Sequence, residues 1–181
     1  GYTDAVATAS KVLADVFAPG DAWFRTGDLM RRDAAGYYYF VDRLGSGFRW
    51  KGENVSSSEV AAVIMRCPGV TDAVVFGVAV EGTEGRAGMA ALTIDDDFRP
   101  ETLMAHMLAH LPSYARPVFL RLCDQIPATA TFKLQQEQLA REGLSVHEGT
   151  DSLWFNEPGT DRIVPCDAGL LHAITTGARR L

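Results

Sequence analysis

Two residues near the start of the chain carry side chains that could together hold a sugar or a phosphate. Asp28 follows a glycine, and its two carboxylate oxygens can accept hydrogen bonds from two neighbouring hydroxyl groups. Arg43 ends an aromatic segment, and its rigid guanidinium fork suits a sugar oxygen or a phosphate. By spacing alone, however, Asp28 is more typical of a turn or a strand end, and Arg43 could form a surface ion pair with Asp42.

A glycine-rich joint follows these residues. Gly45 and Gly47 flank Ser46, and because glycine has no Cβ the backbone there can turn freely, as a pivot between two domains requires. The next segment, KGEN, has Gly52 at its centre and is typical of a tight turn before a helix. A glycine at this place also allows a ligand to approach the backbone closely.

Four motifs in a fixed order resemble the C-terminal part of the acyl-adenylate-forming enzymes, which include acyl-CoA synthetases, firefly luciferase and adenylation domains. They are RTGD, DR, KGENVSSSEV and the lysine of PATATFKLQQEQL. Within that superfamily, FRWKGENV, EGRAGMA, LPSYARPVFLR and TFKL are most similar to the fatty acid transport protein and very-long-chain acyl-CoA synthetase branch. The resemblance extends from about Tyr2 to about Leu144, and more loosely to the end.

The resemblance implies a role for Lys133, which would be the catalytic residue. A lone lysine near a helix start is usually solvated. In the family, a lysine of this motif enters the active site of the other domain, where it would stabilise charge as the acyl carboxylate attacks the α-phosphate. Phe132 stands where many members have glycine, as is typical of the very-long-chain branch. Gln136 stands where many have arginine, so the usual auxiliary cation is replaced by an amide.

The same resemblance implies two binding sites and a hinge. Asp28 and Arg43 would bind the ribose of ATP and AMP, and Gly45 would be the hinge. The loop formed by Gly52, Glu53 and Asn54 would line the channel for CoA in the thioester-forming state.

The implied parent enzyme is an ATP-dependent long- or very-long-chain fatty acyl-CoA synthetase. It would form acyl-AMP and pyrophosphate, rotate its small domain, and then let the CoA thiol displace AMP. Its substrates would be a fatty acid, ATP and CoA, with Mg²⁺ bound in the missing large domain. A CoA ligase for a bile acid or carnitine, and a non-catalytic α+β interaction module with inherited motifs, are the alternatives.

We expect no metal site in this chain: His106 and His110 lie four apart, but no Glu follows His106 and a solvated helix flank is the better interpretation.

The patterning predicts an α+β fold: a small mixed sheet with helices packed on it, preceded by a helix and a β-hairpin from the tail of a larger domain. Helices are expected over 4–17, 56–67, 101–111, 134–142 and 167–176. Strands are expected over 29–33, 37–42, 73–80, 89–94 and 118–122, with short ones at 154–155 and 163–165.

These elements suggest three regions: the tail of the large domain over 1–44, a small lid domain over 45–143 and a C-terminal extension over 144–181. Because the chain has no glycine-rich phosphate loop of the adenylate-forming type, we expect a fragment that is inactive alone. Its natural partner would be the missing N-terminal domain, and its uncovered apolar faces would otherwise bind a second copy.

The composition is that of an ordinary globular protein: 181 residues, 47% hydrophobic and 22% charged, with a net charge of −6. That charge argues against a general nucleic-acid or anionic membrane surface. No signal peptide or apolar run of about 20 residues is present. Cys67, Cys123 and Cys166 are widely spaced and suit buried free thiols in a reducing compartment. We therefore expect a cytoplasmic protein, with peripheral membrane attachment as an alternative for the full-length form.

Overall fold

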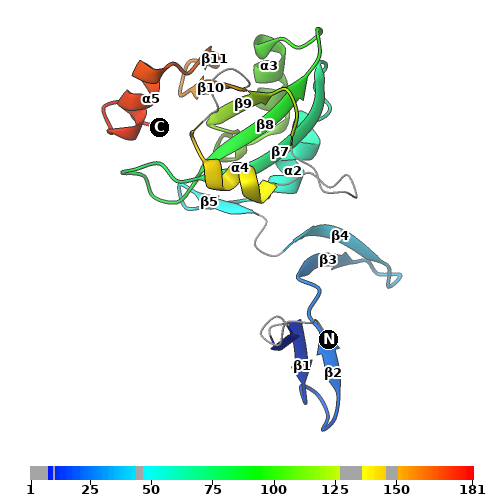
Figure 1. Ribbon diagram of the computed structural model, residues 1–181. Helices are drawn as coiled ribbons and strands as arrows, with labels where there is room; N and C mark the ends of the chain where they lie inside the picture. Colours follow the sequence, from blue (N-terminus) through cyan, green and yellow to red (C-terminus); the bar gives the residue numbers. More distant parts are fainter. Residues whose placement is uncertain (1–7, 10, 44–46, 127–135, 146–150) are drawn as a thin grey trace. The chain divides into compact units, whose positions relative to one another are not determined.

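The computed structural model describes residues 8–9, 11–43, 47–126, 136–145 and 151–181. The chain divides into two units, residues 1–45 and 46–181 (Figure 1).

The first unit contains two antiparallel hairpins. In one, β1 (Val12–Ala14) pairs with β2 (Ala22–Phe24), and in the other, β3 (Asp28–Arg32) pairs with β4 (Tyr38–Arg43). The β3–β4 hairpin confirms the prediction over 29–42. Its turn is organised by Asp33, whose carboxylate accepts hydrogen bonds from the backbone N–H of Ala35 and Tyr37 and from the Tyr39 hydroxyl.

The helix predicted over 4–17 is wrong in its second half. Thr8, Ala9 and Lys11 are helical, but the chain becomes a strand at Val12. The Asp21 carboxylate closes the β1–β2 loop, because it accepts hydrogen bonds from the Trp23 indole and from three backbone N–H groups, those of Val16, Phe17 and Ala18. The Trp23 indole and these N–H groups lower the pKa of Asp21 to about 2. Local hydrogen bonding has overridden an apolar spacing that also suits a helix.

The second unit is built on a five-stranded sheet with the strand order β11-β10-β9-β8-β7. Neighbouring strands are antiparallel except β8 and β9, which are parallel, so the sheet is mixed as predicted. The strands are β7 (Val70–Val78), β8 (Ala87–Ile94), β9 (Phe119–Cys123), β10 (Asp151–Glu157) and β11 (Arg162–Pro165).

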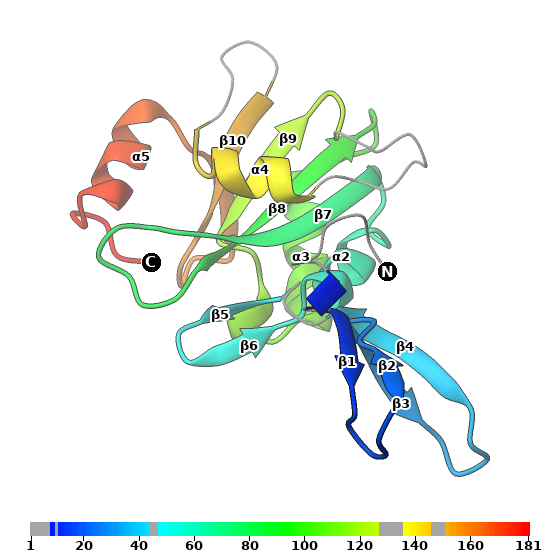
Figure 2. The same cartoon turned by 60° about the horizontal axis from the view of Figure 1, so that its bottom comes forward.

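The helices lie on both faces of this sheet. On one face, α2 (Ser57–Ile64) packs beside α3 (Pro100–His110), which makes the crossover between the parallel strands; on the opposite face lies α4 (Gln136–Glu142) (Figure 2). A 3₁₀ turn (Ser113–Ala115) follows α3, and the final helix is α5 (Ala168–Thr175). Where α3 meets α2, the His106 imidazole bonds to the backbone carbonyl of Val63 at 2.9 Å. His106 therefore joins two helices and is not the solvated flank expected from the sequence.

Two helices begin at residues whose side chains cap them. Ser56 caps α2, since its hydroxyl accepts the N–H of Glu59 at 3.3 Å. Asp167 caps α5, since its carboxylate accepts the N–H of Leu170 at 2.8 Å.

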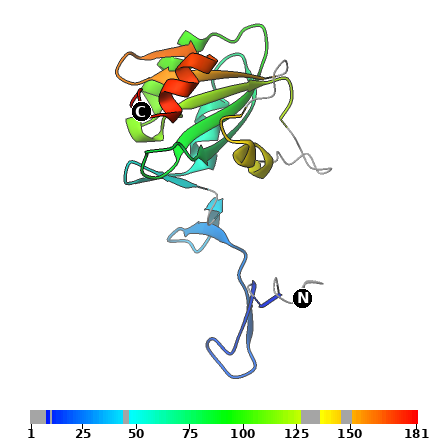
Figure 3. The same cartoon turned by 60° about the vertical axis from the view of Figure 1, so that its left-hand side comes forward.

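Residues 144–181, predicted as an extension, supply β10, β11 and α5 to the second unit. Phe155 of β10 packs its ring 5.8 Å from that of Phe119 in the core. Ile174 of α5 is also buried, and the helix lies beside the β10–β11 pair (Figure 3). The C-terminal segment therefore completes this core.

The three cysteines are free thiols, as predicted, with Cys67 and Cys123 buried and Cys166 half-buried. Burial, followed by the charge of Asp151, raises the pKa of Cys123 to about 11; burial, followed by the charge of Asp167, raises that of Cys166 to about 11. Both thiols are therefore protonated at neutral pH.

Candidate functional site

Asp28 and Arg43 occupy directly opposing positions in the β3–β4 hairpin. Asp28 is half-buried, and its backbone N–H donates to the Thr26 hydroxyl at 3.1 Å. The two residues predicted to bind a ribose are thus brought together by the register of one hairpin.

Two other predicted site residues, Gly45 and Lys133, lie outside the described residues. Gly45 comes between β4 and β5, and Lys133 precedes the first residue of α4 by three positions.

The predicted turn at Gly52 is the tip of a hairpin. Here β5 (Phe48–Trp50) pairs with β6 (Glu53–Val55), and Lys51 and Gly52 have φ of 49° and 86°. Positive φ at both loop residues is the requirement of a type I′ hairpin turn. The sequence predicted the turn but not its flanking strands, which are only three residues long.

The tip of this hairpin is open to solvent. Residues 51–54 are exposed, and among the described residues no heavy atom lies within 4 Å of the position that a Cβ on Gly52 would take. The Lys51 ammonium donates to the backbone oxygen of Leu181 at 2.9 Å, so that side chain is directed to the C-terminal segment. A ligand could therefore approach the backbone of Gly52 closely.

Strand β5 packs against two glycines of the main sheet. Gly77 of β7 and Gly88 of β8 are paired, and Phe48 packs over them. A Cβ on Gly77 would lie 2.6 Å from the Phe48 Cβ, and one on Gly88 would lie 3.0 Å from the tip of its ring. Phe48 can pack this closely because both sheet positions lack side chains.

The loop before β8 holds the next residue of β5. Arg86 donates its backbone N–H to the Arg49 carbonyl at 2.7 Å, and Gly85 bridges to Trp50. Gly85 has φ of 86°, and a Cβ there would lie 2.4 Å from the Arg49 oxygen. This gives the EGRAGMA motif a structural role that sequence reasoning missed: it fixes β5 and so the Gly52 turn. The closely spaced glycines were the available signal.

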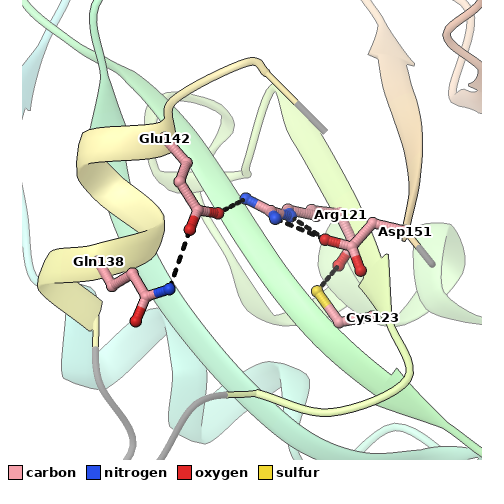
Figure 4. A network of polar contacts seen from close by, with 5 residues as sticks. All are labelled: Arg121, Cys123, Gln138, Glu142 and Asp151. Atoms are coloured by element: carbon pink, nitrogen blue, oxygen red, sulfur yellow. Dashed lines mark hydrogen bonds and ion pairs between the residues drawn. The ribbon is translucent and has the colours of Figure 1, made fainter. Parts of the chain in front are cut away.

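A second anchored region surrounds Arg121, a fully buried arginine in β9 (Figure 4). Its Nε donates to the Asp151 carboxylate at 2.6 Å, and its Nη2 lies 2.5 Å from the same oxygen. Its Nη1 forms an ion pair with Glu142 at 2.7 Å, and Gln138 donates to the other oxygen of Glu142 at 3.1 Å. Burial acts to lower the pKa of Arg121, but the hydrogen bond to Asp151 and the contact with the Glu142 carboxylate together outweigh it, and the pKa is raised.

This network, which we call the Arg121 triad (Arg121, Glu142 and Asp151), was not predicted. An arginine inside an apolar strand pattern, PVFLRLC, was the available signal, because a buried charge requires partners of opposite sign. The partners themselves could not be read from the pattern, since they follow in later elements.

Within the described part of the chain, no group of three or more His, Cys, Asp or Glu side chains is arranged to hold a metal ion. In the same residues, no helix is long and apolar enough to cross a membrane.

The chain is similar in sequence to a known protein family. Residues 59–133 match the family model of the AMP-binding enzyme C-terminal domain. Over 98% of its length the chain is 44% identical to long-chain fatty acid transport protein 1 of Mus musculus, and it covers 28% of that protein. The predicted family resemblance is confirmed.

Solved structures agree with this resemblance to the C-terminal part of adenylate-forming enzymes. A fatty acyl CoA synthetase of Mycobacterium tuberculosis shares 31% identity and a TM-score of 0.57 over 71% of this chain and 25% of its own. The o-succinylbenzoate CoA synthetase of Bacillus subtilis, in complex with its acyl-adenylate intermediate, shares 30% identity and a TM-score of 0.59 over 65% of this chain and 24% of its own. The chain thus spans about a quarter of the length of the proteins it matches.

Proposed function

We propose that this chain is the C-terminal part of an ATP-dependent long- or very-long-chain fatty acyl-CoA synthetase. The observation that carries the proposal is the direct pairing of Asp28 with Arg43 just before the boundary between the two units. The identity to a long-chain fatty acid transport protein over almost the whole chain supports the choice of acid.

In this proposal the β3–β4 hairpin binds the nucleotide sugar. The Asp28 carboxylate accepts hydrogen bonds from the two ribose hydroxyls, and Arg43 supplies a donor fork beside it. Opposing positions on one hairpin suit this task, because the rigid backbone ladder sets the spacing of the two residues.

The second binding region is the β5–β6 turn with Gly52, Glu53 and Asn54, which we assign to the CoA channel. The open space at Gly52 suits passage of a narrow arm along the backbone. Since β5 is seated on glycines of the main sheet, the turn moves with the second unit as a rigid part of it.

The two half-reactions would then use different segments of the second unit. In acyl-AMP formation Lys133 would stabilise the charge that builds on the reacting carboxylate and α-phosphate. Rotation about Gly45 would withdraw Lys133 and bring the 51–54 turn to the acyl-adenylate, where the thiol of CoA displaces AMP. Magnesium would be bound by the large domain.

The test is a separate assay of each half-reaction in the full-length protein, in which the large domain precedes this chain. Lys133→Ala should slow acyl-AMP formation about 100-fold or more, which corresponds to the loss of one preorganised charge. Thioester formation from supplied acyl-AMP and CoA should continue. Arg141→Ala, which removes an exposed cation from α4, is the matched control and should change neither rate. Equal loss of both half-reactions in Lys133→Ala would contradict the proposed role.

The acid can be identified in the same assay. Pyrophosphate release should be fastest with long or very long fatty acids; faster release with a bile acid or carnitine would identify another CoA ligase. The isolated chain should release none, because adenylation requires groups of both domains in near-attack geometry. Turnover by the isolated chain would overturn the two-domain proposal.

A further inference from the structure

The Arg121 triad joins three elements of the second unit. Arg121 belongs to β9, Glu142 to the last turn of α4, and Asp151 to the first position of β10. Lys133 comes after β9 and three residues before α4 begins. Because only Leu134 and Gln135 lie between Lys133 and α4 in the sequence, the anchoring of α4 limits how far Lys133 can reach.

The helix α4 needs such an anchor. It is seven residues long, and isolated helices of this length are not stable in water. Its described contacts include Leu139, which is buried in the core, Ala140, which packs against that core, and the ion pair of Glu142 with Arg121. An apolar contact such as that of Leu139 has no strong direction, whereas an ion pair fixes the distance and orientation of its partners.

A contribution to stability does not by itself explain why charged residues, and not apolar ones, hold α4 to the sheet. Removing a guanidinium and its partners from water costs free energy, and apolar residues of similar volume often do as well or better. A buried charged network can instead serve to select one arrangement of the elements it joins. In this chain the selected arrangement is that of α4 on β9, since Asp151 already fixes the Arg121 guanidinium through its Nε and Nη2.

We propose that the Arg121 triad is a positioning device for Lys133, with Arg121, Glu142 and Asp151 as positioning residues for acyl-AMP formation. The inference rests on the proposed function, because it needs Lys133 to act in that step. None of the three side chains touches the reacting atoms in this scheme. Their effect is transmitted through the position of α4.

The first experiment uses the full-length protein with Glu142→Gln. A neutral amide keeps the size of the side chain but removes the charge that faces Arg121, so α4 should shift or loosen. Acyl-AMP formation should fall about 10- to 100-fold, as expected when a catalytic group is displaced by about 1 Å. Thioester formation from supplied acyl-AMP should stay within about twofold of wild type. Arg141→Gln on the same helix is exposed and is the matched control, with neither rate changed.

A second variant separates positioning from folding. The triple substitution Arg121→Met, Glu142→Leu and Asp151→Leu replaces the network by apolar groups and should leave the protein folded, since such replacements are often neutral. Acyl-AMP formation should still fall about 10-fold or more. Amide hydrogen exchange should be faster at Gly143, which donates to Leu139 at the end of α4, and unchanged along β8.

The outcomes are distinguishable. If both half-reactions fall equally in Glu142→Gln, or if the folded triple variant forms acyl-AMP at the wild-type rate, the triad does not position Lys133. If Lys133→Ala abolishes acyl-AMP formation while Glu142→Gln leaves it unchanged, this inference fails and the proposed function stands. If Lys133→Ala has no effect, the proposed role of the lysine fails, and the inference fails with it.

Discussion

The Gly52 turn and the helix α4 are fixed to the same sheet by opposite means. The turn is held by close backbone approach: Phe48 packs over a glycine pair, and Arg49 bonds to the Arg86 backbone. The helix is held by a buried triad of charges together with Leu139. Packing contacts such as those of Phe48 contribute to the free energy of unfolding nearly independently of one another. A buried charge network stabilises the fold only when all of its members are present. The two anchors should therefore respond differently to single substitutions.

The largest single loss is expected from Arg121→Met. It leaves two carboxylates beside an apolar side chain, and breaking a buried pair costs about 3–5 kcal/mol. We expect about 3 kcal/mol, at the lower end, because the side chains of Asp151 and Glu142 remain 11% and 20% exposed and can recruit water. Urea unfolding of the chain measures it. The triple apolar variant is the comparison, and its free energy of unfolding should return to within about 1 kcal/mol of wild type. If the single and triple variants are equally unstable, the three charges do not act as one unit.

A smaller loss is expected from Gly85→Ala at the other anchor. The alanine Cβ would lie 2.4 Å from the Arg49 oxygen and the residue would keep φ of 86°, so strain and displacement of β5 should cost about 1–3 kcal/mol. Gly82→Ala is the matched control in the same loop: φ is 74°, but among the described residues nothing lies within 4 Å of its Cβ position. The difference between the two free energies of unfolding isolates the steric part. Equal losses would mean that Gly85 is required only for its backbone angle.

Alkaline pH should lower the stability of the chain through ionisation of the buried Cys123 thiol. Its pKa is about 11 in the folded chain, because burial and the nearby Asp151 disfavour the thiolate, and about 9 for an unperturbed thiol. The folded state therefore binds more protons between these values, so this contribution to stability is complete below about pH 9 and is lost as the pH rises to about 11. The measurement is the free energy of unfolding as a function of pH, with Cys123→Ala as the comparison. If the variant loses as much stability as wild type between pH 9 and 11, Cys123 is not the group responsible.

The smallest effect is expected from Asp21, an exposed carboxylate that can be compared with the carboxylates of the Arg121 triad. Asp21 accepts four hydrogen bonds at the surface, and its pKa is lowered to about 2. Since the folded pKa lies below the usual value of 3.8, the stabilisation is present above about pH 4 and is lost as the pH falls to about 2. The Trp23 indole N–H signal in NMR should shift over that range and should be displaced at all pH values in Asp21→Asn. A signal independent of pH would show that the carboxylate does not organise the loop.

Local patterns predicted most of the elements of the second unit correctly. The helices predicted over 56–67 and 101–111 depend on apolar periodicity within one element, and α2 and α3 confirm them. The hairpin that pairs Asp28 with Arg43 was also predictable, because aromatic strand formers flank a short turn.

The failures share a physical cause, since each depends on contacts distant in sequence or on short strands. β5 and β6 are strands because glycines of β7 and β8 accept Phe48, which the segment itself does not reveal. The first hairpin was misread because Val12 to Phe17 suits a helix until Asp21 binds the loop. The Arg121 triad required β9, α4 and β10 to be in place. The assignments of Gly45 and Lys133 remain predictions, and they came from motif resemblance.

The triad also constrains how this sequence can change over evolutionary time. Loss of the arginine alone leaves paired negative charges, and loss of either carboxylate alone weakens the compensation of a buried cation. A lineage that abandons the network must therefore replace all three residues nearly together, although they are separated in the sequence by 21 and 9 positions. We expect related sequences to fall into two groups, those with the complete set and those with apolar residues at all three positions. Mixed combinations should be rare and short-lived.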